Sequence, residues 1–218
     1  MMTTEILALI TVLFAYLVGA VPTGYLLVKK AKGLDIREHG SGNTGATNVK
    51  RLMGNKAFVF VLLMDFLKGF LAVKLTMWVL SSKTFGYLPQ YLPTWATDEL
   101  IHQTVYVLVA LAAIIGHSRS VFLNFSGGKS AITGLATVVA LMPTAGLILG
   151  LLAFLIIKIT RTVSIGSMSV AVITPMTLIA LQYPFPYIIY GTTAALYVIY
   201  LHRTNIMRLI QGTENRLT

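Results

Sequence analysis

Uncharged stretches of the chain are long enough to cross a lipid bilayer, and short polar segments rich in Lys and Arg separate them. Residues 6–28 carry no charge between Glu5 and Lys29, and a crossing takes about 20 residues. The preceding charge is negative and the apolar run is too long for a signal peptide, so we read it as a retained first helix. Residues 57–80 and 100–116 predict two further spans.

Two later apolar runs each predict a pair of helices. Residues 130–157 are uncharged with Pro143 near the middle, and residues 162–201 are uncharged but interrupted by a Tyr-Pro-Phe-Pro segment at 183–186. The second run is too long for one crossing. A single crossing through the first run would put the basic residues that follow it outside the cell. Two short crossings that turn at Pro143 put them inside, as the positive-inside rule prefers.

These spans predict an all-α integral membrane protein with about seven transmembrane helices, some of them short, with the N-terminus outside and the C-terminus cytoplasmic. The length leaves no room for a second large domain, so one domain covers residues 1–218. In this topology Lys83 lies in an outer loop. Most other Lys and Arg residues, and all the polar segments that carry chemistry, face the cytoplasm.

Composition supports a membrane protein and narrows its partners. The chain is 56% hydrophobic and 11% charged, whereas a soluble domain carries about 25% charged residues. The formal net charge of +10 fits the positive-inside bias and attraction to anionic membrane lipid. Nucleic-acid binding is not expected, because no basic soluble face with interleaved aromatic residues exists. The absence of Cys excludes a thiol nucleophile, a disulfide and a Cys-based metal site.

The first polar segment runs from Ser41 to Asn48 and is closed by Lys50 and Arg51. Its Gly residues let the backbone approach a ligand closely. Its hydroxyl and amide groups, with exposed backbone N–H groups beside two cations, are typical of a phosphate site. Taken alone, the segment is also compatible with a simple connection between helices.

A second polar segment contains Gly116-His117 and then Gly127-Gly128-Lys129. A Gly-Gly-Lys turn before a helix offers backbone donors, a helix N-terminus and a cation, which again suits phosphate. Alone it is a weak signal, since such turns often end in a Lys that snorkels to the membrane surface.

A third polar segment, 202–214, begins with His202 and contains Asn205 and Glu214. His202 and Asn205 are three positions apart, so they share a face if the helix continues through them. A smaller polar turn at 161–167 lies on the same side of the membrane. The convergence of several basic loops on one face favours a binding or catalytic site over isolated interfacial residues.

Charges inside the second span require a separate explanation. Asp65 and Lys68 are three positions apart, so they can pair on one helical face. We expect a structural ion pair there, with a catalytic role as the alternative. His102, near the outer end of the third span, is expected to be interfacial.

Other enzyme classes are disfavoured by motifs that the sequence lacks. There is no Walker A motif, no Gly-x-Ser-x-Gly elbow and no His-Glu-x-x-His. Carboxylates are too few for a metal cage, so no metal and no cofactor are expected.

The chain resembles the acyl-phosphate-dependent glycerol-3-phosphate acyltransferases, bacterial membrane enzymes that start phospholipid synthesis. Residues 40–51, 116–129 and 202–214 look like the three motifs of that family, in order. Ser120 stands where Pro is common, and residues 130–133 depart from the usual Gly-Val-Ala-Thr. The resemblance implies transfer of a fatty acyl group from acyl phosphate to the sn-1 hydroxyl of glycerol 3-phosphate, giving lysophosphatidic acid and phosphate. It also implies a seven-helix fold, a place in the bacterial plasma (inner) membrane and an active site on the cytoplasmic face.

Residue roles follow from the resemblance together with the chemistry of the loops. The residues expected to be catalytic are Ser41, Arg51, His202 and Asn205. The residues expected to bind substrate are Gly42, Asn43, Gly45, Thr47, Asn48, Gly127, Gly128, Lys129, Arg203 and Ser167. The residues expected to be structural are Asp65, Lys68 and Glu214. Either His202 or a substrate phosphate oxygen takes the hydroxyl proton, and the acyl chain is expected in a lipid-facing groove between helices.

The expected partners are the two substrates, membrane lipid and an enzyme that produces acyl phosphate. A small transporter for a phosphorylated or lipidic anion is the main alternative, because polar loops and intramembrane charges fit that class too. It predicts sites on both faces and an internal repeat, and no repeat is visible. A structural lipid-scaffold protein is a third hypothesis, which the specific loop sequences disfavour.

Overall fold

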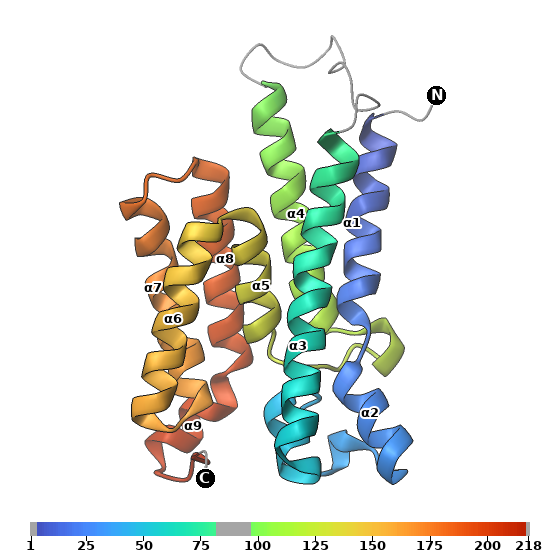
Figure 1. The fold of residues 1–218 in the computed structure, drawn as a ribbon, viewed down its shortest axis with the longest axis vertical. Helices are drawn as coiled ribbons and strands as arrows, with labels where there is room; N and C mark the ends of the chain where they lie inside the picture. Colours follow the sequence, from blue (N-terminus) through green and yellow to red (C-terminus); the bar gives the residue numbers. More distant parts are fainter. Residues whose placement is uncertain (1–3, 82–96, 217–218) are drawn as a thin grey trace.

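The computed structural model describes residues 4–81 and 97–216, and this part of the chain is helical, without a β-strand (Figure 1). The α-helices are α1 (Thr4–Ala20), α2 (Thr23–Lys32), α3 (Ala46–Ser81), α4 (Asp98–Ser118), α5 (Ala131–Leu141), α6 (Pro143–Thr160), α7 (Val163–Ala180), α8 (Phe185–Leu201) and α9 (Arg203–Ile210). Two short 3-10 turns are η1 (Ile36–Glu38) and η2 (Val121–Leu123).

The long helices form two packed groups, with α5 between them (Figure 1). Helices α1, α3 and α4 pack together, and α6, α7 and α8 form the second group. Helix α5 contacts α3 on one side and α6 on the other, and α4 also contacts α8. The segments that connect α2 to α3 and α4 to α5, with α9, gather toward the end of the molecule that carries the C-terminus.

The first predicted span, residues 6–28, lies within an apolar segment long enough to cross the membrane, Glu5–Lys32, but this segment is two helices and not the single helix that was predicted. Helix α1 ends at Ala20 and α2 begins at Thr23, so the chain breaks at Pro22. Proline has no N–H to donate and its ring clashes with the preceding turn, so it interrupts a helix in this position. The uncharged stretch contained this break, but hydrophobicity alone did not distinguish it from a continuous span.

Side chains from α3 and from the connection after α4 satisfy the carbonyl groups that the break leaves free. The Lys68 ammonium donates to the Val21 carbonyl at 2.9 Å, and the Ser120 hydroxyl donates to the Ala20 carbonyl at 2.6 Å. Lys68 also lies 2.8 Å from the Asp65 carboxylate, and both side chains are buried. The predicted pairing of Asp65 with Lys68 is therefore confirmed as a contact, and the contact with Val21 supports the structural role proposed for it.

The predicted helix breaks in the later runs are confirmed. Helices α5 and α6 meet at Pro143, and α7 and α8 are separated at residues 181–184. Helix α5 has 11 residues and is about 16 Å long, too short to cross a bilayer core of about 30 Å by itself. Within the described ranges, four segments are long and apolar enough to span: Glu5–Lys32, Asp98–Ser118, Pro143–Thr160 and Val163–Ala180.

The helix that contains the second predicted span, residues 57–80, begins before that span. Helix α3 starts at Ala46 and is kinked at Gly54, whose φ of 80° and ψ of −169° are outside the helical region. Glycine tolerates such a positive φ because it has no Cβ. The first turns of α3 therefore form a separate short segment, which carries Lys50 and Arg51 toward the other loops.

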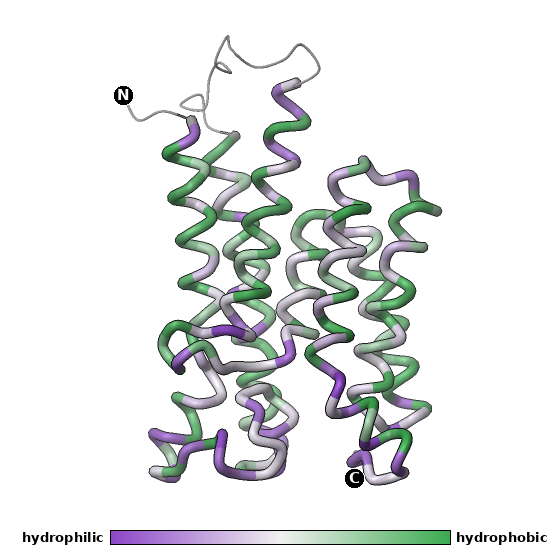
Figure 2. The backbone as a smooth tube through the Cα atoms, turned by 180° about the vertical axis from the view of Figure 1, so that it is seen from behind, coloured by the Kyte–Doolittle hydropathy of each residue, from purple (hydrophilic) through white to green (hydrophobic). Residues whose placement is uncertain are grey.

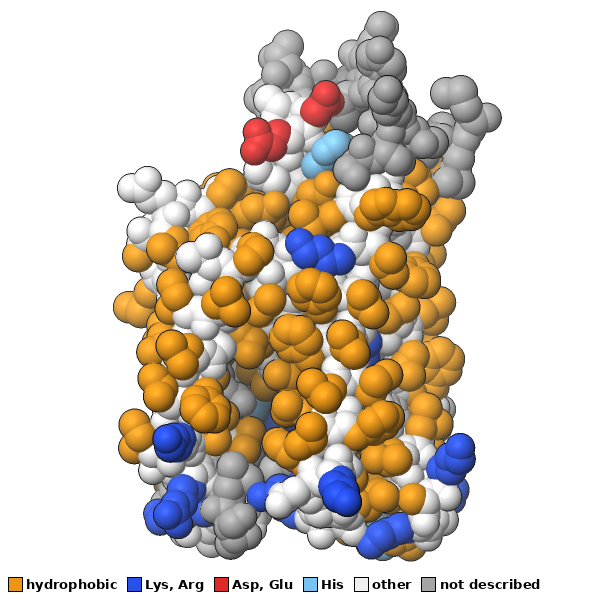
Figure 3. Space-filling model, viewed as in Figure 1, with side chains coloured by type: hydrophobic (Ala, Val, Ile, Leu, Met, Phe, Trp, Pro, Cys, Tyr) orange, Lys and Arg blue, Asp and Glu red, His pale blue; other side chains and the backbone are white. Residues whose placement is uncertain are grey.

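Charge is distributed unevenly along the length of the molecule. Apolar side chains cover the middle of the visible face, and most Lys and Arg side chains on it gather at the end that carries the C-terminus (Figure 3). The hydropathy of the backbone follows the same division (Figure 2). Asp98 and Glu99 begin α4 at the opposite end. Lys83, which was predicted to lie outside the cell, falls outside the described residues.

Candidate active site

A cavity of about 520 Å³ joins all three polar segments to the interior of the second helix group. All four residues that were predicted to be catalytic line it: Ser41, Arg51, His202 and Asn205. Other predicted residues that line it are Asn43, Gly45, Thr47, Asn48, Asp65, Lys129, Ser167 and Glu214. Predicted residues that are not among its lining are Gly42, Lys68, Gly127, Gly128 and Arg203.

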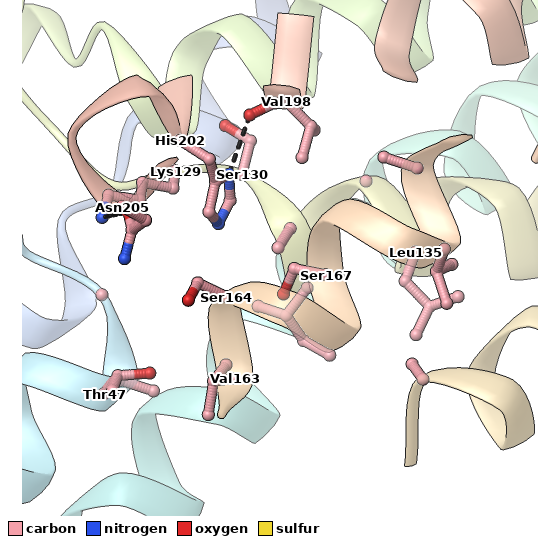
Figure 4. Close-up of a pocket in the computed structure, with 18 of the residues that line it drawn as sticks. Thr47, Lys129, Ser130, Leu135, Val163, Ser164, Ser167, Val198, His202 and Asn205 are labelled. Carbon is pink, nitrogen blue, oxygen red and sulfur yellow. Dashed lines mark hydrogen bonds between the residues drawn. The ribbon is translucent and has the colours of Figure 1, made fainter. Parts of the chain in front are cut away.

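The cavity has a polar end and an apolar end (Figure 4). His202, Lys129 and Asn205 lie near one another at the polar end, with Thr47 across from them. Leu135 lies at the opposite end, among apolar side chains. The cavity therefore suits a ligand that combines anionic groups with a hydrocarbon chain.

Asn48 holds the first polar segment in shape. Its amide donates to the carbonyl groups of His39 and Asn43, both at 2.9 Å, and to that of Ile36 at 3.3 Å, while its oxygen accepts from the Ser41 backbone N–H at 3.0 Å. Its side chain is 1% exposed. Because the loop occupies its donors and acceptor, Asn48 contributes by fixing the backbone rather than by offering free groups to a ligand.

The N-terminus of α3 offers the unoccupied donors of this segment. The Gly45 N–H donates to the Asn43 side chain at 2.9 Å, whereas the N–H groups of Ala46 and Thr47 have no acceptor in the described part of the chain. Exposed N–H groups and the helix dipole favour an anion at this end. Arg51, one turn further along α3, lines the same cavity and adds a guanidinium to that environment.

The Gly127-Gly128 turn was predicted to offer backbone N–H groups to phosphate, but in the structure it packs against His117. The Gly128 N–H donates to the His117 carbonyl at 3.0 Å instead of pointing into the cavity. A Cβ atom at Gly128 would collide with the His117 ring, and one at Gly127 would collide with the His117 carbonyl. The glycines therefore let the loop pack on the end of α4. Because Lys129 follows Gly128, this close packing also fixes the position of the Lys129 backbone.

Lys129 brings its charge into the polar end of the cavity. Its ammonium donates to the Asn205 amide oxygen. Burial, reinforced by the positive charge of Arg208, lowers the pKa of Lys129 to about 8, although Glu214 opposes this change. Among the described residues no carboxylate is in direct contact with this partly buried cation, so it is suited to a phosphate ligand, which would supply negative charge.

His202 and Asn205 do not lie on one continuous helix, which was the condition for the predicted shared face. Helix α8 ends at Leu201, and His202 forms the junction with α9. The His202 Nδ1 lies 2.8 Å from the Val198 carbonyl, so Nδ1 carries the proton and Nε2 remains free to accept one. Burial lowers the pKa of His202 to about 4, which keeps the ring neutral at neutral pH. Both residues still line the cavity.

Glu214 ties the C-terminal segment to the site. Its carboxylate accepts from Ser164 at 2.7 Å, from Asn205 at 2.6 Å and from Arg208 at 2.7 Å. Burial raises the pKa of Glu214, but the hydrogen bonds from Arg208, Asn205 and Ser164 outweigh it and hold the pKa below its usual value. Glu214 therefore remains ionised and orients the Asn205 amide, which supports the structural role predicted for it.

Arg203 was predicted to bind substrate, but its side chain is directed toward Tyr200 and does not line the cavity. Its guanidinium lies 4.6 Å from the centre of the Tyr200 ring and donates to the Tyr200 carbonyl at 3.2 Å. Gly42, in the first polar segment, is also turned away, since its N–H donates to the His39 carbonyl at 3.1 Å. Neither position reaches the cavity.

Arg208 and His117 are among the cavity residues that were not assigned a role from the sequence. Arg208 lines the cavity and lies three positions after Asn205 on α9, a spacing that could have suggested it. His117 also lines the cavity, and its Nδ1 lies 3.8 Å from the Asp65 carboxylate. The proximity of Asp65 on α3 to His117 on α4 depends on how the two helices pack, and no local sequence pattern predicts it.

Comparisons with known proteins give matches over most of the chain. The family model described as "Glycerol-3-phosphate acyltransferase" matches residues 9–212. A glycerol-3-phosphate acyltransferase from Nostoc sp. is 44% identical over 206 residues, covering 94% of this chain and 90% of the relative. The glycerol 3-phosphate form of PlsY (YgiH), described as an integral membrane glycerol 3-phosphate acyltransferase, matches with 35% identity and a TM-score of 0.82, covering 97% of this chain and 96% of that one. Its lysophosphatidic acid form matches with 34% identity and a TM-score of 0.79, covering 97% and 95%.

Proposed function

This chain belongs to the glycerol-3-phosphate acyltransferase family, and from this premise we propose that its acyl donor is acyl phosphate. The chain is a multi-pass membrane enzyme that acylates glycerol 3-phosphate and gives lysophosphatidic acid. With acyl phosphate as donor, the second product is inorganic phosphate. An enzyme that produces acyl phosphate is then its functional partner.

The observation that carries this proposal is the composition of the cavity. Cations from three separate segments, Arg51, Lys129 and Arg208, line the polar end, and the same cavity continues into an apolar interior. Acyl phosphate has one anionic end and one hydrocarbon end, so this shape fits both of its parts. Glycerol 3-phosphate is small and anionic, and it fits at the polar end beside the donor.

The two phosphate groups need separate partners because they repel each other. The N-terminus of α3 with Arg51 forms one anion-binding region, and Lys129 with Arg208 forms the other. We assign glycerol 3-phosphate to the Lys129 region, following the motif resemblance, and acyl phosphate to the α3 region. Ser41, Asn43 and Thr47 provide shorter-range hydrogen bonds in the α3 region.

The reaction needs alignment and charge stabilisation rather than a covalent acyl-enzyme. Acyl phosphate is a mixed anhydride, so its carbonyl carbon is already activated. The sn-1 oxygen forms a new bond to that carbon, the bond from the carbon to the phosphate oxygen breaks, and phosphate leaves with the electron pair. The enzyme holds the two reactants together and stabilises the developing oxyanion.

The hydroxyl proton passes either to His202 or to a substrate phosphate oxygen. The neutral ring and the free Nε2 of His202 support its role as acceptor. Asn205, held by Glu214, is suited to orient glycerol 3-phosphate. A phosphate oxygen remains the alternative acceptor, and the variants of His202 distinguish the two.

Purified protein with labelled glycerol 3-phosphate tests the donor directly. We expect lysophosphatidic acid with acyl phosphate and none with acyl-CoA. Product formed with acyl-CoA alone would overturn the donor assignment while leaving the family and the acceptor unchanged. Transport of glycerol 3-phosphate by vesicles, without product, would instead support the transporter hypothesis.

We also retain the proposed topology of about seven crossings, with the active site on the cytoplasmic face of the plasma membrane. The gathering of basic residues around the cavity supports it. Single Cys residues introduced at Asn43, Phe125 or Gly212 of this Cys-free chain should resist an impermeant thiol reagent in intact cells. Labelling at any of these positions would overturn the orientation.

A further inference from the structure

The apolar part of the cavity is an arm enclosed by α5, α6, α7 and α8. Each helix contributes residues three or four positions apart, so one face of each helix lines the same space. The residues from α7 and α8 in this arm include Val170, Ala171, Thr174, Gly191, Ala194 and Ala195. Gly191 is buried and the other five have at most 8% of their surface exposed, so the arm is internal to the helix group.

The arm has a closed floor. Helices α5 and α7 run away from the polar end, whereas α6 and α8 run toward it (Figure 1). The lining residue farthest from the polar end on each of these helices is Val138, Leu149, Thr174 or Gly191. Beyond this level lie Leu178 and Tyr190, which are fully buried and belong to the main hydrophobic cluster. Packed side chains therefore end the cavity.

The distance to the floor can be counted along α7. Ser164 lies at the polar end and Thr174 at the floor, ten positions later, which corresponds to about 15 Å along a helix. With C–C bonds of about 1.5 Å in a zigzag, this length holds on the order of 12 carbons. The arm is therefore long enough to take most of a fatty acyl chain.

Thr174 is compatible with an apolar floor although it carries a hydroxyl. That hydroxyl donates to the Val170 carbonyl at 2.8 Å, within its own helix. No further hydrogen bond is needed from a ligand. Leu149, which is fully buried, supplies the largest side chain of the floor.

We propose that Leu149, Thr174 and Gly191 set the length of acyl chain that the enzyme prefers, by ending the arm that holds the chain. This proposal rests on the proposed acyl phosphate reaction and deepens it. The methyl end of a chain that fits would lie against these residues. A longer chain would have to bend or displace its carbonyl from the polar end.

Small side chains keep the arm open above its floor. Ala171 of α7 and Ala195 of α8 pack in one cluster with Val198, and all three line the cavity. Thr174 lies three positions beyond Ala171 on the same face. A larger side chain at Ala171 therefore creates a new floor about one helical turn, roughly 5 Å, closer to the polar end.

A different path for the chain would make the floor irrelevant. Figure 3 shows a hollow between the lower halves of α3 and α6. A chain that left the polar end sideways through this hollow would extend into lipid and would not meet Leu149 or Thr174. The two paths predict different responses to the same substitutions.

The test measures kcat/KM with a series of saturated acyl phosphates, from short to long, for purified variants in detergent. Ala171→Leu should lower kcat/KM for long chains by about 10-fold or more relative to short chains, since misfit of a methylene in an apolar pocket costs about 10- to 200-fold. Leu149→Ala should shift the preference toward longer chains. Matched controls are Val172→Leu on α7 and Leu147→Ala on α6, whose side chains are 56% and 69% exposed and face away from the arm.

Activity of the wild-type enzyme with short acyl phosphates tests the proposed donor, and the chain-length profile of the variants tests the proposed floor. An enzyme that is active with acyl phosphate, but whose Ala171→Leu variant keeps the wild-type chain profile, would overturn the floor and support the sideways path. Failure of every acyl phosphate with the wild-type enzyme would overturn the donor assignment itself. If Leu149→Ala does not fold, the Ala171→Leu and Ala195→Leu variants still decide the question.

Discussion

Lys129 and Asn205 are 76 positions apart in the chain, and their side chains are in contact, with the Lys129 ammonium donating to the Asn205 amide oxygen. The other end of that amide donates to Glu214 at 2.6 Å. Asn205 is therefore held from both sides. This contact joins the second polar segment to the third and brings a cation to the polar end of the cavity.

Lys129→Ala should weaken glycerol 3-phosphate binding more than it slows saturated turnover. A charge-assisted contact is worth about 1.5–3 kcal/mol, so the KM for glycerol 3-phosphate should rise about 10- to 100-fold. Steady-state kinetics at saturating acyl phosphate measure this, with Lys158→Ala, a basic residue of α6 that does not line the cavity, as the control. An unchanged KM with a collapsed kcat would assign Lys129 to the transition state instead.

The affinity for glycerol 3-phosphate should fall as the pH rises through about 8. The pKa of Lys129 is lowered to about 8 by burial, so the unliganded side chain is charged below this pH and loses its charge above it. The second ionisation of phosphate, near 6, is complete by then. KM should therefore rise between about pH 7 and pH 10, where an ordinary lysine would still be largely charged.

Lys129→Arg provides the control for this pH dependence. Arginine keeps its charge over the whole range, so the rise in KM centred near pH 8 should disappear even if the geometry raises KM throughout. A rise in KM near pH 8 that persists in Lys129→Arg would be caused by the titration of another group.

His202→Gln should lower kcat by about 10²-fold or more if Nε2 takes the hydroxyl proton. Glutamine can still hydrogen-bond but cannot act as the base. Because the pKa of His202 is lowered to about 4 by burial, a limb near pH 6 in the rate profile belongs to a substrate phosphate, whose second ionisation lies there. That limb should be present in the variant and the wild type alike. A kcat near the wild-type value would move the role of base to a phosphate oxygen.

Gly128→Ala should damage the site through His117 rather than through a lost phosphate contact. The new methyl group would collide with the His117 ring, and overpacking of this kind costs about 1–3 kcal/mol. Thermal unfolding in detergent should show the loss, together with a higher KM for glycerol 3-phosphate because Lys129 is the next residue. Gly150→Ala is the matched control, since its Cβ would meet ordinary contacts only.

A second substitution distinguishes the two explanations for Gly128. If packing is the cause, His117→Ala combined with Gly128→Ala should recover part of the stability and of the affinity. If the backbone at Gly128 binds phosphate directly, the double variant should be no better than the single one.

Local sequence patterns predicted the helices and breaks that depend on nearby residues. Pro143 and the Pro-containing segment at 183–186 interrupt uncharged runs that are too long for one crossing, and the structure has breaks at both places. Asp65 and Lys68 pair because an α-helix puts positions three apart on one face. These outcomes follow from backbone geometry and proline chemistry, which act over a few residues.

The sequence by itself therefore determined most of the helical segments, a set of site residues most of which line the cavity, and the family. Only the tertiary structure decided how those residues are used. Asn48 is occupied by its own loop, Gly128 packs on His117, and the chain turns at His202 so that Asn205 meets Lys129. Each of these outcomes is a competition among partners for hydrogen bonds and space. Those partners are brought together by helices distant in the chain, and no local pattern encodes which of them prevails.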